Sequence, residues 1–155
     1  MGLGKNDMFV LIRIVLGALF IVSGGEKLLS PAANFLFVIH GYDVLPLPLE
    51  AVAAFVFPWV EVLTGLFVFL GLWLRPSLGV LLLIAGSLMG IVGQAILRKL
   101  PLENCGCFGD MVHLPLRGVI LLDLVIFVLA GLCLMNIRKA SLFSLDQCYD
   151  LPGKK

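Results

Sequence analysis

Two cysteines separated by a single residue are the feature of this sequence with the clearest chemistry. Residues 103–110 read Glu-Asn-Cys-Gly-Cys-Phe-Gly-Asp. Two thiols at this spacing can close a very small ring, and Gly106 supplies the backbone freedom that closure needs. Disulfide geometry is demanding, so such a ring is strained, and a strained, exposed disulfide has a raised reduction potential. Cys105 and Cys107 are therefore predicted to be catalytic, passing oxidising equivalents to another dithiol.

Charged residues near the pair would tune its reactivity, because the thiolate is the attacking species and nearby cations favour it. The cations close in sequence are Arg98, Lys99, His113 and Arg117, and the acidic residues are Glu103 and Asp110. The two sets oppose each other, so the sequence gives no net direction. We expect Asp110 and His113 to support the cysteines.

Two other interpretations of the segment remain open. It could be an inert turn with two incidental cysteines, or a metal site built from Cys105, Cys107, Asp110 and His113. Zinc loops normally space paired cysteines by two to four residues. A single spacer makes joint ligation awkward, so we expect no metal.

The composition indicates where these residues must work. Of 155 residues, 61% are hydrophobic and 14% charged, and the mean hydropathy is +1.11. Soluble domains have about half of their residues apolar and about a quarter charged. Most of this chain's surface must therefore face the lipid bilayer. A net charge of +1 offers no argument for a nucleic-acid partner.

Four long apolar runs predict an all-α, integral membrane four-helix bundle. They span about residues 8–29, 47–74, 76–97 and 116–137. Each has about 20 residues or more, enough at ~1.5 Å per residue to cross a ~30 Å bilayer core. Pro31 ends the first run, Arg75-Pro76 makes a tight turn before the third, and a short interfacial helix is expected around Ala32 to Ile39. The domain thus covers residues 1–137, and residues 138–155 form a polar C-terminal tail.

The basic residues favour one orientation. The face with both termini carries Lys5, Arg13, Arg75, Arg138, Lys139, Lys154 and Lys155, and the other carries Lys27, Arg98, Lys99 and Arg117. Lys and Arg tend to remain cytoplasmic. We therefore expect a multi-pass protein of the cell (inner) membrane with cytoplasmic termini and an extracytoplasmic Cys-Gly-Cys loop, where disulfides persist. The length of the first run and Arg13 within it favour a retained helix over a cleaved signal peptide.

Ionisable residues interrupt the apolar runs at Arg13, Glu26, Lys27, Glu61 and Asp123. Such residues are expensive in a bilayer and usually face the bundle interior or a water-filled cavity. A polar cluster below the Cys-Gly-Cys loop is predicted. It is a structural ion pair that fixes helix packing, or a proton path or quinone headgroup site in which Glu26, Lys27, Glu61 and Asp123 support the cysteines. A third interpretation is that these side chains extend to the membrane surface without partners.

Two further features have plain structural interpretations. Gly86 and Gly90 make a pair of small residues that lets helices approach closely. Cys133 lies ~27 Å along the fourth helix from its loop-side end, too far to exchange with Cys105 or Cys107, and is expected to be a small apolar core residue.

The electrons gained at Cys105 and Cys107 must leave the chain, because no second cysteine pair lies on the same side. They can pass to a membrane carrier, for which a quinone docked among the helices is the economical choice. They can instead pass to another protein, for which a thioredoxin-like partner is the choice. The sequence leaves both routes open.

Three stretches resemble the MauE/DoxX group of small four-helix redox-associated membrane proteins. Residues 13–28 are similar to its first helix, Trp59 to Gly65 to its acidic second helix, and Cys105 to Asp110 to the loop of the MauE branch. The resemblance covers about residues 8–136. It implies a role in disulfide formation or thiol transfer outside the cytoplasm, often beside a thioredoxin-like partner. Cys148 lies outside the recognised pattern.

Three functions therefore stay open at this point. The first is a membrane thiol–disulfide redox protein, or an accessory subunit of one, that supports extracytoplasmic protein maturation. The second is a membrane protein that handles copper or zinc through the loop. The third is an assembly subunit without chemistry of its own.

Overall fold

The computed structural model describes residues 5–42, 44–98 and 116–141, and every element in that part of the chain is a helix. The helices are α1 (Lys5–Leu29), α2 (Ala32–Tyr42), α3 (Leu47–Leu70), α4 (Leu74–Leu97), α5 (Leu116–Met135) and α6 (Ile137–Ala140). Four of them, α1, α3, α4 and α5, are long and apolar enough to cross a membrane. The prediction of an all-α membrane bundle with four spanning helices is confirmed.

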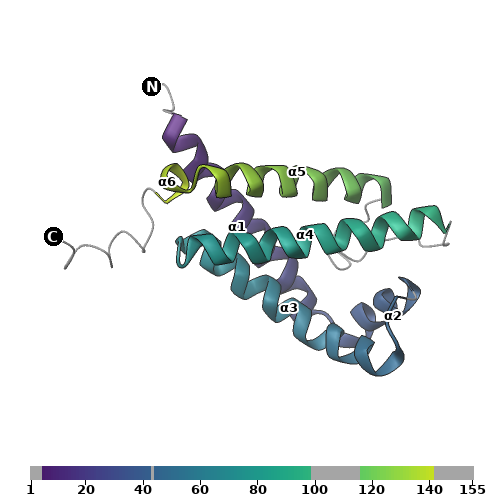
Figure 1. Ribbon diagram of the computed structural model, residues 1–155. Helices are drawn as coiled ribbons and strands as arrows, with labels where there is room; N and C mark the ends of the chain where they lie inside the picture. The colour runs from purple at the N-terminus through teal and green to yellow at the C-terminus, as the bar shows by residue number, and fades with distance from the viewer. Residues whose placement is uncertain (1–4, 43, 99–115, 142–155) are drawn as a thin grey trace.

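The two ends of the bundle differ. At one end lie α6, the start of α1 and the turn between α3 and α4 (Figure 1). At the other end α4 finishes and α5 begins, and α2 lies beside the first turns of α3 (Figure 1). The segment 99–115, which contains the two neighbouring cysteines, therefore joins two helices at the end of the bundle where α2 lies.

Helices α1 and α3 cross in very close contact at Gly17 and Gly65. A Cβ atom on Gly17 would lie 2.6 Å from the backbone nitrogen of Phe69, and one on Gly65 would lie 2.9 Å from the carbonyl oxygen of Gly17. Side chains at these positions would force the helices apart, so glycine is required here for packing.

The prediction that Gly86 and Gly90 provide a close approach is wrong for the described part of the chain. A Cβ on Gly90 would meet nothing within 4 Å, and one on Gly86 would make an ordinary 3.5 Å contact with the Phe127 ring. The spacing of small residues identifies a helix face that can pack closely, but it does not show whether another helix lies against that face.

Helix α1 ends part-way along α3. Gly24 packs against Pro58 and Glu61, where an added Cβ would lie 2.9 Å from the Pro58 carbonyl oxygen and from the Glu61 Cβ. The helices run in opposite directions, so the end of α1 at Leu29 leaves the first turns of α3 without α1 as a neighbour. Helix α2 packs there instead, and it is longer than the expected helix at residues 32–39.

The turn between α3 and α4 consists of residues 71–73, ahead of the predicted turn at Arg75-Pro76. Gly71 adopts a left-handed conformation (φ 71°), and the N–H of Leu72 donates to the Phe67 carbonyl, which together end α3. Pro76 falls inside the first turn of α4, where its missing N–H costs no helical hydrogen bond.

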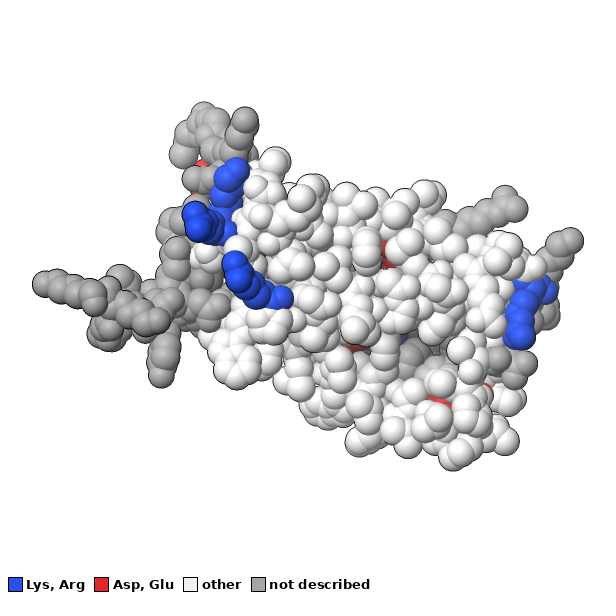
Figure 2. Space-filling view, in the orientation of Figure 1, with Lys and Arg blue, Asp and Glu red and all other residues white. Residues whose placement is uncertain are grey.

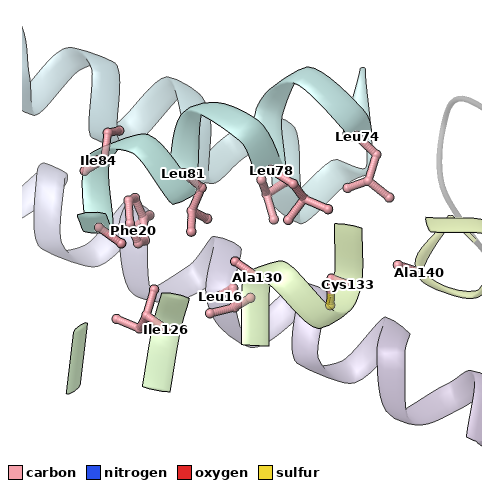
Figure 3. Close-up of a cluster of buried hydrophobic side chains, with 12 residues drawn as sticks. Leu16, Phe20, Leu74, Leu78, Leu81, Ile84, Ile126, Ala130, Cys133 and Ala140 are labelled. Carbon is pink, nitrogen blue, oxygen red and sulfur yellow. The ribbon is translucent and has the colours of Figure 1, made fainter. Parts of the chain in front are cut away.

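The main core lies at the terminus-side half of the bundle, where α1, α3, α4 and α5 meet. Leu16, Leu78 and Leu81 are almost completely buried there, as is Cys133 (Figure 3). Cys133 packs between helices with its Sγ 4.0 Å from the Phe9 carbonyl oxygen. Its predicted role as a small apolar core residue is confirmed.

A second, smaller cluster lies near the opposite end and ties three elements together. It consists of Tyr42 from α2, Val92 and Ala95 from α4, and Val119 from α5. The last turns of α4 and the first turns of α5 are therefore anchored against the end of α2. This cluster adjoins the candidate site.

Candidate functional site

A buried ion pair links α1 to the middle of α3. The Lys27 Nζ lies 2.7 Å from the Glu61 Oε2, and the two side chains are only 2% and 4% exposed. Lys27 also donates to the Ser23 Oγ at 2.8 Å. Ser23 precedes Lys27 by one helical turn, so both lie on the same face of α1. Two opposite charges held this tightly neutralise each other inside a bundle that would otherwise exclude them.

A cavity of about 180 Å³ lies directly beside this pair. Its walls come from α1, α2, α3, α4 and the connection that follows α2. They consist of Lys27, Phe35, Val38, Ile39, Tyr42, Val44, Leu45, Ala53, Phe57, Glu61, Leu88, Ile91 and Val92. Among the described residues that line it, Lys27 and Glu61 are the only charged ones, so this part of the lining is apolar with one charged side.

Helix α2 forms a wall of the cavity and is held near both of its ends. Near its start, the Phe35 ring lies 5.6 Å from the Lys27 Nζ and 6.2 Å from the Phe57 ring. Near its end, the His40 Nδ1 lies 3.0 Å from the Glu50 Oε2. Glu50 is buried, although His40 is largely exposed. The contact between them holds α2 against the first turn of α3.

The α3 side of this arrangement follows from helical spacing. Glu50, Ala53, Phe57 and Glu61 recur every three or four residues and so share one face of the helix. Glu50 meets α2, Ala53 and Phe57 line the cavity, and Glu61 meets Lys27. One stripe of α3 therefore provides both the clamp for α2 and the charged side of the cavity.

Asp123 of α5 and Tyr42 of α2 add acidic groups next to the cavity. Asp123 is 6% exposed, and its Oδ2 accepts no hydrogen bond from the described residues. Burial first, and the negative charge of Asp123 second, together raise the pKa of Tyr42 to about 12. Asp123 thus acts electrostatically on a residue of the cavity wall.

Arg13 belongs to the other end of the bundle. Its guanidinium is buried and donates to the Ala140 carbonyl at 2.8 Å, which fastens α6 to α1. The polar tail is expected to begin at Arg138, but residues 138–140 belong to α6, which packs against α1. Arg13 is not among the described residues that line the cavity.

Of the residues expected in a polar cluster, the structure brings Lys27 and Glu61 together as an ion pair, and Asp123 acts electrostatically on Tyr42 in the cavity wall. Glu26 is half-buried on the same turn of α1 and does not line the cavity. The predicted catalytic residues Cys105 and Cys107, with Asp110 and His113, lie outside the described residues. Within the described ranges no three His, Cys, Asp or Glu residues are grouped to hold a metal ion.

Sequence reasoning missed Ser23 and Glu50 as parts of the site. The four-residue spacing between Ser23 and Lys27 could have identified Ser23, because it puts both residues on one face of α1. Glu50 could have been identified because it shares a face of α3 with Glu61. Neither spacing by itself identifies the residue on the neighbouring helix that completes the contact.

The spanning helices and the buried charges beside a cavity define a multi-pass membrane protein with a polar site inside its bundle. The chain belongs to the family described as methylamine utilisation protein MauE, which matches residues 5–136. The resemblance to the MauE branch is thereby confirmed. Comparisons with curated proteins and with solved structures find no match.

Proposed function

We propose that this chain is a thiol–disulfide redox protein of the inner membrane that supports the maturation of an extracytoplasmic protein. Cys105 and Cys107 are the reacting residues, and a thioredoxin-like protein is the exchange partner. The family description names methylamine utilisation, and we propose the same process as the setting for this chain.

The observation that carries the proposal is the Cys105-Gly106-Cys107 sequence in the segment between α4 and α5. The described ends of that segment adjoin Tyr42 and the cavity through the cluster with Val92 and Val119. A cysteine pair on a segment whose neighbouring helices contact the cavity, where Lys27 and Glu61 lie, would suit chemistry that moves electrons and protons together.

The disulfide between Cys105 and Cys107 is attacked by a thiolate of the reduced partner, and a mixed disulfide forms. The partner's second thiol breaks that bond, so the partner becomes oxidised and this chain holds two thiols. A lipid-soluble quinone then accepts the two electrons and two protons of the dithiol, and the disulfide is restored.

The orientation that this function needs is the one favoured by the charge distribution. Basic residues gather near the terminus-side end, with fewer at the opposite end and the flank between them mainly uncharged (Figure 2). Described examples at the first end are Arg75, Arg138 and Lys139. We propose that this end faces the cytoplasm and that the cysteine pair faces outward.

The test is the redox state of Cys105 and Cys107 in intact cells that express the full chain with Cys133→Ala and Cys148→Ser. A membrane-impermeant maleimide that adds mass should leave the pair unlabelled before reduction and label it after mild reduction. The control keeps Cys148 and carries Cys105→Ser and Cys107→Ser, and it should become labelled only after lysis. Labelling without reduction would contradict the redox function, and labelling of Cys148 in intact cells would contradict the orientation.

A further inference from the structure

We propose that the cavity between α2, α3 and α4 binds the ring of a lipid-soluble quinone, with the Lys27–Glu61 pair facing the ring oxygens. The inference rests on the proposed function, because it assigns a place to the electron acceptor. It concerns binding, however, and can be tested without any cysteine chemistry.

The size of the cavity suits one six-membered ring. The volume is about 180 Å³. A buried apolar cavity of about 150 Å³ is enough to hold one benzene molecule. Drug-sized ligands occupy about 300–1,000 Å³. The cavity is therefore too small for a whole isoprenoid quinone but large enough for its headgroup.

The chemistry of the walls matches a ring with polar atoms at its edge. Phe35 and Phe57 offer aromatic surface, and Leu88 and Ile91 offer aliphatic surface. The polar atoms of Lys27 and Glu61 lie on one side only. A plain hydrocarbon chain would gain nothing from a charged wall, whereas carbonyl or hydroxyl groups of a quinone or quinol can exchange hydrogen bonds with an ammonium and a carboxylate.

A second observation points to a ligand with hydrogen-bond donors. The Oδ2 of Asp123 is buried and accepts no hydrogen bond from the described residues. A buried polar atom in this condition is costly unless a further group satisfies it. Asp123 acts electrostatically on Tyr42, and Tyr42 lines the cavity. A hydrogen-bond donor of a ligand bound beside Tyr42 would therefore lie on the side of the cavity where the charge of Asp123 acts.

The cavity also has a route to the lipid. Val44 and Leu45 line it and are 42% and 37% exposed, so the wall is open at the connection between α2 and α3. Figure 2 shows the bundle hollowed near α2, with charged atoms visible inside the hollow. An isoprenoid tail can leave through this opening and lie along the apolar flank. Reduction of the bound ring takes up the two electrons and two protons released when Cys105 and Cys107 form their disulfide.

The experiment measures equilibrium binding of a decyl-substituted benzoquinone to the purified full chain in lipid nanodiscs. Ala53 lines the cavity, and Ala53→Phe should weaken binding by at least about tenfold. Ala51→Phe is the matched control, because Ala51 is exposed two residues away on the same helix, and it should bind within about twofold of the wild type. Equal binding by Ala53→Phe and the wild type would overturn the proposal.

A second measurement needs no substitution and covers the case in which Ala53→Phe does not fold. An azido-substituted benzoquinone, activated by light on the wild-type protein, should label the peptides that contain Phe35 to Tyr42 or Ala53 to Glu61. Labelling confined to other peptides would overturn the site. Displacement of the decyl-benzoquinone by a fatty acid at the same concentration would identify an acyl chain as the occupant and would also overturn it.

The variant with Cys105→Ser and Cys107→Ser separates this inference from the proposed function. It should bind the decyl-benzoquinone as the wild type does, because the side chains assigned to the ring, Lys27 and Glu61 among them, are unchanged in it. Binding that persists while the wild-type thiols never form a disulfide would support the site and contradict the redox function. A reversible disulfide in a protein that does not bind the probe would support the redox function and contradict the site.

Discussion

The ammonium of Lys27 and the carboxylate of Glu61 lie 2.7 Å apart inside the bundle, joining the last turns of α1 to the middle of α3. Each group would be costly alone in this position, so the two depend on each other. The same pair forms the charged side of the cavity. It can therefore hold the helices together and also contact a ligand, and the two roles call for different experiments.

Breaking this ion pair from one side should destabilise the protein. Lys27→Met leaves the Glu61 carboxylate buried without its counter-ion, and we expect a loss of about 3–5 kcal/mol in the free energy of unfolding. The double variant Lys27→Met, Glu61→Leu removes both charges and should recover most of that loss. Denaturant unfolding in detergent micelles measures both, with Arg75→Met, an exposed position, as the control.

The same double variant separates the two roles of the pair. A protein that recovers its stability but no longer binds the decyl-benzoquinone has lost a binding group and not its fold. If Lys27→Met alone is as stable as the wild type, the pair does not hold α1 to α3. Full quinone binding by the stable double variant would restrict the pair to a structural role.

Much of the fold follows from apolar run length and helix-ending residues. The second run begins at Leu47 and the third run ends at Leu97 in the structure, as the limits of the apolar stretches predict. The turn between α3 and α4 lies earlier than the sequence predicts. Pro76 favours a helix start, but Gly71 has already ended α3 through its left-handed conformation.

Contacts between helices were harder to predict. The sequence shows that Lys27, Glu61 and Asp123 need partners, because charges inside a membrane are costly. It does not show that Lys27 pairs with Glu61, since this depends on the Gly17–Gly65 crossing and on its register. The cavity also depends on α1 ending before the first turns of α3, which no local pattern encodes.

The glycine crossing gives a test of the packing with an internal control. Gly65→Ala would place a Cβ 2.8 Å from the backbone nitrogen of Ile21, so α1 and α3 must move apart. We expect a loss of about 1–3 kcal/mol in the free energy of unfolding. Gly90→Ala meets nothing within 4 Å and should be neutral or slightly stabilising, because alanine favours helix over glycine.

The comparison is made by thermal unfolding of the two variants in the same detergent. Equal melting temperatures would show that α1 and α3 do not approach as closely as Gly17 and Gly65 indicate. A loss at Gly90→Ala that exceeds the loss at Gly65→Ala would show instead that the Gly90 face of α4 has a packing partner.

Tyr42 should remain protonated to unusually high pH. Its pKa is raised from 10.0 to about 12, by burial first and by Asp123 second. The chain has two tyrosines, so Tyr149→Phe leaves Tyr42 as the single reporter, and its tyrosinate absorbance should rise only near pH 12. A tyrosine in the unfolded chain ionises near pH 10, so the raised pKa of Tyr42 makes the free energy of unfolding depend on pH. The contribution of Tyr42 to that free energy is complete below about pH 10 and is lost as the pH rises towards 12.

Asp123→Asn provides the control for this titration. Removing the negative charge should lower the Tyr42 midpoint, while burial keeps it above the value of a free tyrosine. A midpoint near pH 10 in the folded Tyr149→Phe protein would show that Tyr42 is open to water, and the cluster with Val92 and Val119 would then be incorrect.

The last prediction concerns the intermediate of the proposed exchange. The mixed disulfide is cleaved by the partner's second thiol in the forward direction and by the other cysteine of this chain in the reverse direction. A chain that keeps only one of Cys105 and Cys107 loses the reverse route, so it should retain more of its partner covalently than the wild type does. We expect Cys105 to be the outward-facing sulfur, since it follows the polar Asn104, whereas Cys107 is followed by Phe108. Cys107→Ser should then trap more partner than Cys105→Ser.

The measurement is a non-reducing gel of each single-serine variant in a Cys148→Ser background, with alkylation at harvest. A band that disappears on reduction, is present in Cys107→Ser and is absent from the double variant would support the exchange, and mass spectrometry should identify a thioredoxin-like protein in it. A stronger band in Cys105→Ser would reverse the order of attack. If neither single variant forms a reducible adduct and the wild-type thiols stay free under oxidising conditions, the redox function is wrong. Metal content of the purified protein would then be the next measurement, because the same two thiolates can bind copper or zinc.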